Sequence, residues 1–73
     1  MDLVIELADG RVIGIEIKAD AAPGRDAARH LAWLEEALGS RFAAGVVFHT
    51  GPRPIAYSTS IVGLPISVLW SVG

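Results

Sequence analysis

The sequence contains no cysteine, so no disulfide can stabilise the fold. This matters in a chain of 73 residues, because a domain of that size hides only ~60% of the surface of its unfolded chain. Stability must therefore come from apolar packing, and 52% of the residues are hydrophobic. The absence of cysteine also fits a reducing compartment, and we predict a cytoplasmic protein.

Two further absences concern the partners. No apolar run approaches the ~20 residues of a membrane-spanning helix, and the start, Met1 to Val4, lacks the basic segment of a signal peptide. We expect a soluble chain with no membrane partner. Basic residues are also scarce, and the net charge is −2 with a pI near 5.5. This argues against a module that binds nucleic acid by charge alone, but not against a metal-dependent enzyme that acts on nucleic acid.

What is present begins with two alternating segments rich in Val, Ile and Leu, residues 2–7 and 11–18, joined by a turn signal at residues 8–10. A two-residue turn mixes the faces of this hairpin, whereas a three-residue turn with Gly10 in the left-handed conformation separates them. Register follows the hydrophobic pattern, so we predict the second. Its apolar face holds Leu3, Ile5, Leu7, Ile13, Ile15 and Ile17, and its other face holds Asp2, Val4, Glu6, Val12, Glu16 and Lys18.

A helix is predicted over residues 25–38, and Gly39 is placed to end it. Its apolar stripe at helical spacing consists of Ala27, Ala28, Leu31, Leu34 and Leu38. Residues 42–49 form a continuous apolar run, which is typical of a strand covered on both faces. A crossover through the helix makes this strand parallel to residues 11–18.

The remainder predicts a short tail of two strands and a helical turn. Residues 55–57 and 61–62 are the strands, and residues 64–70 form the helical turn, with Pro65 at its first position. The fold class is therefore α/β, with a β-hairpin–helix–β core followed by a short β-β-α tail. We expect one domain over residues 1–73.

One group of residues could carry chemistry. The predicted register sets Asp2 opposite Glu16, with Lys18 further along the same face. Cβ atoms of directly paired residues lie ~4.5–5.5 Å apart, so the two carboxylates could share Mg²⁺ or Mn²⁺. Such an ion could activate water against a phosphodiester, with Lys18 beside the water or the phosphate. The alternative is a solvated hairpin face on which Glu16 and Lys18 are ordinary surface charges.

The pattern of Asp2 followed by Glu16-Ile17-Lys18 on a hairpin, and then a helix, resembles the PD-(D/E)XK phosphodiesterase superfamily. The segments DLVIE (2–6), GIEIKA (14–19), AGVV (44–47) and LPISVLW (64–70) together resemble the DUF4143 family, a domain found at the C-terminus of prokaryotic AAA-type ATPases.

The resemblance implies a restriction-endonuclease-like fold and a Mg²⁺ or Mn²⁺ site. Its metal ligands would be Asp2, Glu16 and the Ile17 carbonyl, with Asp2, Glu16 and Lys18 as the catalytic residues. Two departures matter: Met1 stands where the superfamily often has proline, and no upstream acidic helix is present. The chain also lacks the phosphate-binding motif G-x-x-x-x-G-K-[ST], so we predict no ATP site. We therefore expect a C-terminal piece, truncated at its N-terminus.

Other residues invite structural interpretations. His30 is predicted to be exposed, and His49 to be a satisfied structural histidine at a strand end, although strand ends are also where α/β sites gather. Trp33 falls off the helix stripe and forms a contact surface or covers the sheet, while Trp70 is predicted to pack onto the core.

Two functional hypotheses follow. The first is a metal-dependent nuclease domain with nucleic acid as its substrate. The second is a catalytically silent module that docks onto an ATPase domain or self-associates. Because the missing helix would leave apolar sheet surface uncovered, we predict a homo-oligomer.

Overall fold

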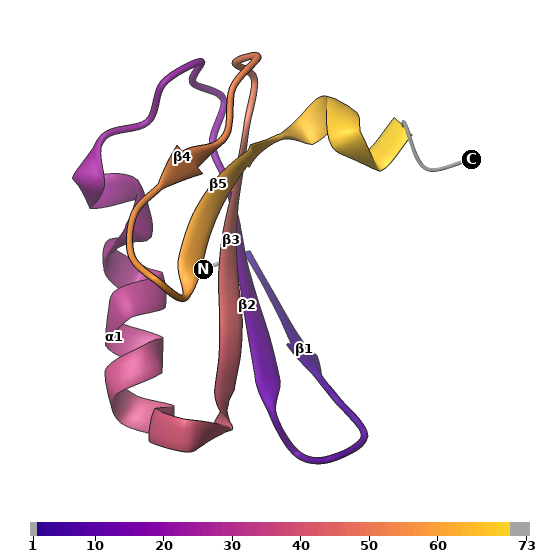
Figure 1. Cartoon of the computed structure of the whole chain (residues 1–73), viewed down its shortest axis with the longest axis vertical. Helices are drawn as coiled ribbons and strands as arrows, with labels where there is room; N and C mark the ends of the chain where they lie inside the picture. The colour runs from indigo at the N-terminus through magenta and orange to yellow at the C-terminus, as the bar shows by residue number, and fades with distance from the viewer. Residues whose placement is uncertain (1, 71–73) are drawn as a thin grey trace.

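The computed structural model describes residues 2–70, and its first two strands form the predicted hairpin (Figure 1). Strand β1 (Leu3–Glu6) pairs antiparallel with β2 (Val12–Ile17), and Leu3 lies opposite Ile15. Gly10 has a φ of 87°, in the left-handed region that glycine tolerates. Both the register and the conformation of the turn are therefore confirmed.

The turn is closed by local hydrogen bonds. The Leu7 amide donates to the Arg11 carbonyl, and the Gly10 amide donates to the Leu7 carbonyl. The Asp9 carboxylate accepts from the Arg11 amide and from the Arg11 guanidinium. These two bonds hold the pKa of Asp9 below its ordinary value, and the bond from the Arg11 backbone amide has the larger effect. The sequence thus specifies the turn through a glycine and a side chain that caps it.

The predicted helix is also confirmed, although its first turn is tighter than an α-helix. A 3₁₀ turn, η1 (Arg25–Ala28), leads into α1 (Arg29–Leu38), and a second 3₁₀ turn, η2 (Gly39–Arg41), follows. Gly39 ends the helix with a φ of 57°, and its amide donates to the Glu35 carbonyl. Leu31 is completely buried, which places the predicted stripe against the sheet.

Strand β3 (Phe42–His49) runs parallel to β2, as predicted. Val12 pairs with Phe42 and Ile13 with Ala44, so Ala43 is an extra residue in β3. The extra residue of the bulge shifts the alternation of the strand by one position. Phe42 and Gly45, three residues apart, therefore both lie on the buried face of the sheet. The bulge is one reason why the segment lacks a strict period of two.

The tail differs from the prediction at its end. Strand β4 (Ile55–Ala56) pairs antiparallel with β5 (Ile61–Pro65), which pairs parallel with β3, so the strand order is β1-β2-β3-β5-β4. The last helical turn is η3 (Ile66–Trp70), of 3₁₀ type. Its predicted start at residue 64 was wrong, because Leu64 pairs with Phe48 and so continues β5. The predicted packing of Trp70 onto the core was also wrong, since 76% of its surface is exposed.

The core lies between α1 and one face of the sheet. It consists of Ala27, Ala28, Leu31, Phe42, Val47 and Ile61, with Leu34, Leu38 and Tyr57 packed around it. In Figure 1, α1 lies on one side of the sheet and η3 extends on the other. Along residues 2–70 no element of that second side is packed across the sheet in the way that α1 is. The expectation that β3 is covered on both faces was therefore wrong.

The uncovered face is called the open face below. Pairing places on it Leu3, Ile5, Ile13, Ile15, Ile17, Ala44, Val46, Phe48, Ala56, Val62 and Leu64. The predicted apolar face of the hairpin belongs to this set, so it is segregated as predicted but turned away from α1. The described chain is thus a mixed α/β fold with two layers. None of its helices is long and apolar enough to cross a membrane.

Candidate functional site

Asp2 lies directly before β1 and extends the hairpin pairing by one residue. Its amide donates to the Ile15 carbonyl at 3.2 Å. One oxygen of its carboxylate, Oδ2, accepts a hydrogen bond of 2.6 Å from the Ile17 amide. The pairing of β1 with β2 begins at Leu3 and Ile15, so Asp2 lies one residue before the first pair, and its placement opposite Glu16 stays a prediction. The carboxylate of Asp2 is held against the backbone at the end of β2 by a bond to Ile17 that the sequence did not predict.

Glu16 is buried, with 5% of its surface exposed, on the face of β2 that α1 covers. The alternative of a solvated surface charge is therefore wrong for this residue. An ionised carboxylate is costly to bury unless polar groups or cations compensate it. The imidazole of His30, on the first turn of α1, approaches it, with Nδ1 3.7 Å from Oε2. This contact becomes an ion pair when His30 is protonated.

Lys18 follows β2 on the same side of the sheet as Glu16. Its amide donates to the Phe48 carbonyl at 2.9 Å, which extends the parallel pairing beyond the strand. Its side chain lines a cavity of about 270 Å³ together with His30, Asp20 and Arg29 among others. His30 therefore connects the buried Glu16 to the cavity that contains Lys18. The surroundings of Lys18 carry both signs of charge.

The Ile17 carbonyl points toward the side of β2 on which Asp2 lies. In a β-strand, the N–H and C=O of one residue point toward the same neighbouring strand. The Ile17 amide is bound by Asp2, so its carbonyl also faces the side where Asp2 lies. Two carboxylates and a carbonyl are the hard oxygen ligands that Mg²⁺ and Mn²⁺ prefer.

This donor set fits a divalent cation only in part. Among residues 2–70, no three or more His, Asp and Glu side chains are grouped so that they could hold a metal ion. An ion held by the Asp2 and Glu16 carboxylates would leave most of its coordination positions to water, so such an ion would be bound weakly.

His30 is the residue of this neighbourhood that sequence reasoning missed. Its exposure was predicted correctly, but its contact with Glu16 was not. A signal was available, because His30 lies three residues after Ala27 and four before Leu34, both in the predicted stripe. Residues at that spacing share one side of a helix, so His30 had to lie near the strand that the stripe covers.

His49 ends β3 and is almost completely buried, with 1% of its surface exposed. Its Nδ1 accepts a hydrogen bond of 3.1 Å from the Gly51 amide. Its Nε2 has no hydrogen-bond partner within the part of the chain that the structure describes. A Cβ on Gly63 would lie 3.3 Å from the His49 ring, so the imidazole is packed against β5. The prediction of a structural histidine with satisfied hydrogen bonds therefore holds for Nδ1 but not for Nε2.

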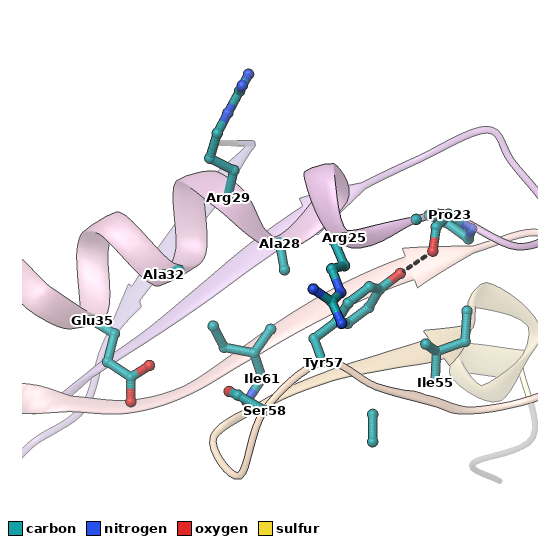
Figure 2. Close-up of a pocket in the computed structure, with 12 residues that line it drawn as sticks. Pro23, Arg25, Ala28, Arg29, Ala32, Glu35, Ile55, Tyr57, Ser58 and Ile61 are labelled. Carbon is teal, nitrogen blue, oxygen red and sulfur yellow. Dashed lines mark hydrogen bonds between the residues drawn. The ribbon is translucent and has the colours of Figure 1, made fainter.

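A separate groove of about 590 Å³ lies between the η1–α1 segment and the β4–β5 segment (Figure 2). Its walls include Ala28, Ala32, Ile55 and Ile61, and Asp2, Glu16 and Lys18 are not among its lining residues. Figure 2 shows the Tyr57 hydroxyl donating to the Pro23 carbonyl, at 2.7 Å. Burial, followed by the negative charge of Asp20, raises the pKa of Tyr57 above its ordinary value.

The comparisons with known proteins define the family but not an activity. No curated protein and no solved structure shows significant similarity to the chain. One family model, described as a domain of unknown function, DUF4143, matches residues 1–69. This match spans the hairpin with Asp2, Glu16 and Lys18, the helix, and all the strands that follow. The chain therefore belongs to the DUF4143 family.

Proposed function

We propose that the chain is a nuclease-like domain of the PD-(D/E)XK type, which binds Mg²⁺ or Mn²⁺ weakly and acts on phosphodiester bonds of nucleic acid. The observation that carries this proposal is the placement of Asp2. Its carboxylate accepts a hydrogen bond of 2.6 Å from the Ile17 amide, and Ile17 directly follows the buried Glu16. The antiparallel β1–β2 hairpin, α1 and the parallel β3 match the hairpin–helix–strand core that this superfamily implies.

Each residue has a distinct role in this proposal. Asp2, Glu16 and the Ile17 carbonyl are the metal ligands. A bound divalent ion supplies a Lewis acid that neutralises charge on the phosphate and activates water. The bond from the Ile17 amide fixes the orientation of the Asp2 carboxylate, and burial fixes that of Glu16. Lys18, at the edge of the neighbouring cavity, holds the attacking water or the scissile phosphate by its ammonium group.

Calorimetric titration with Mn²⁺ tests the site. We expect weak binding by the unmodified chain and no measurable binding by Asp2→Asn or Glu16→Gln. Lys18→Ala should still bind Mn²⁺ but lose any cleavage of single- or double-stranded DNA. Glu6→Gln is the matched control, because Glu6 is an exposed carboxylate on the same strand as the Asp2 extension. Binding that is indifferent to Asp2→Asn, or lost equally in Glu6→Gln, would overturn the proposal.

A second candidate function is a catalytically silent module that docks onto an AAA-type ATPase domain. Two observations favour it. Among the residues described, no group of three or more His, Asp and Glu side chains could hold a metal ion. The cavity at Lys18 is also lined by Asp20 and Asp26, whose negative charges oppose the approach of a phosphate. Binding of Mn²⁺ without any cleavage of DNA would support this second function.

A further inference from the structure

Among residues 2–70, the open face carries no charged or polar side chain. The residues that pairing assigns to it on all the strands are Leu, Ile, Val, Ala and Phe alone. By contrast, the opposite face includes Glu16 and His49 even though α1 covers it. Soluble sheets with one solvated face normally alternate apolar residues with polar ones. The composition of the open face is therefore typical of a sheet face that is buried against another layer.

The large apolar side chains on this face are all at least partly exposed, and three of them are exposed to a large extent. Leu3 is 52% exposed, Ile5 41% and Ile17 53%. The η3 turn, which extends on the same side of the sheet in Figure 1, adds Leu69 at 52% and Trp70 at 76% exposure. Contiguous exposed apolar surface of this kind marks an interaction site on a soluble protein.

The size of the surface matches what a stable interface needs. At ~4.8 Å between strands and ~3.3 Å per residue, four strands of about five residues cover roughly 320 Å² in projection. Trp70 adds on the order of 150 Å². A standard interface buries ~800 Å² per partner, of which ~60% is apolar, so about 480 Å² of apolar surface is required. The open face and η3 together provide about that area.

The same chemistry restricts the partner. A surface without charge offers nothing to phosphates and no ion pair to an acidic or basic peptide. What it does complement is another flat apolar sheet, since two sheets pack face to face ~10 Å apart with their strands rotated by about 30°. A second copy of the chain presents such a sheet, and a two-fold axis brings the same patch of both copies together.

We propose that the open face is the interface of a symmetric dimer, in which two copies of the chain pack sheet against sheet and η3 enlarges the contact. The dimer leaves Glu16 and Lys18 of the proposed metal site uncovered by the partner, because both lie with His30 on the side of the sheet that α1 covers. Each copy retains its own cavity at Lys18 and its own groove beside β4.

Light scattering coupled to gel filtration tests the proposal. The expected mass is twice the 7.7 kDa of one chain. Ile5→Lys places a charge on the open face at an edge strand and should return the mass to that of a single chain. The matched control is Trp33→Lys, because Trp33 is 67% exposed on α1, away from the open face, and should leave the dimer intact. Circular dichroism of both variants verifies that they are folded.

A second measurement covers the case in which Ile5→Lys does not fold. Dilution of the unmodified chain, followed by amide NMR spectra, should move the signals of β1, β2 and β3 and leave those at the exposed side of α1 unchanged. A mass of one chain at high concentration would overturn the proposal. So would a dimer that Trp33→Lys disrupts and Ile5→Lys does not.

Discussion

The two faces of the sheet differ in a way that their composition does not predict: one buries polar side chains, and the other exposes apolar ones. The face against α1 contains a carboxylate and an imidazole, yet Glu16 is 5% exposed and His49 1%. The open face is wholly apolar, yet Leu3 and Ile17 remain more than half exposed. The difference shows that an apolar pattern identifies a surface that needs to be buried. Which face is buried within one chain depends on where the helix packs.

The largest expected effect contrasts one side chain from each face. Leu31→Ala removes a completely buried side chain from the core and should lower the free energy of unfolding by about 2–5 kcal/mol. Ile5→Ala, at 41% exposure, should cost less than about 1.5 kcal/mol. Urea denaturation of both variants gives the comparison, at a protein concentration low enough for light scattering to report the mass of one chain. Equal losses there would mean that the open face is covered within one chain as thoroughly as the core.

An intermediate effect on stability is expected at the β1–β2 turn, which sets the register of the hairpin and so decides which side chains lie on the open face. Gly10→Ala should destabilise the chain by about 1–2 kcal/mol, because a residue with a Cβ resists a left-handed backbone, and the φ of Gly10 is 87°.

Gly24→Ala is the matched control for that turn. Gly24 has a φ of −76° and nothing within 4 Å of an added Cβ, so its unfolding free energy should change by less than about 0.5 kcal/mol. Thermal unfolding measures both variants. A loss in Gly24→Ala as large as in Gly10→Ala would show that the turn does not depend on a positive φ.

The smallest effect concerns the hydroxyl that ties the β4–β5 segment to the chain before α1. Tyr57→Phe removes the hydrogen bond to the Pro23 carbonyl and should cost about 0.5–1.5 kcal/mol. The raised pKa of Tyr57 in the fold adds a pH dependence. Its contribution is complete below the unfolded value near pH 10 and is lost as the pH rises through the folded value.

Alkaline titration isolates this group, because Tyr57 is the only tyrosine of the chain. Its ultraviolet absorbance should report ionisation at a higher pH in the folded chain than in urea. Stability of the unmodified chain should begin to fall above about pH 10, and the difference from Tyr57→Phe should disappear as the pH passes the folded pKa of Tyr57. Ionisation at the same pH in both states would contradict this prediction.

The sequence specified the hairpin well, because local rules decide it. Alternation of apolar residues and the glycine at position 10 were sufficient to give the observed register, and that register brought Asp2 to the end of β2. Gly39 and the stripe around Leu31 located the helix for the same reason. In each case the deciding interaction lies within a few residues of the signal.

The failures involve contacts between distant segments. The apolar run at residues 42–49 indicates burial, but it does not reveal whether the chain covers one face of the strand or both. The prediction that both faces of β3 are covered was therefore wrong. Trp70 has an apolar side chain and no local signal that η3 extends away from the sheet. The contact of His30 with Glu16 required the helix to be placed over a particular strand.

The position of β3 has a consequence for the kinetics of folding. The β1–β2 and β4–β5 pairs are antiparallel and local, and hairpins of this kind form in ~1–10 μs. Strand β3, between them, makes only parallel pairs, each with a strand distant in the sequence. Pairing of that kind must first overcome the closure of a long loop, which slows it. We expect two early hairpins whose inner edges stay unpaired until β3 joins them, and aggregation during refolding should compete with that step.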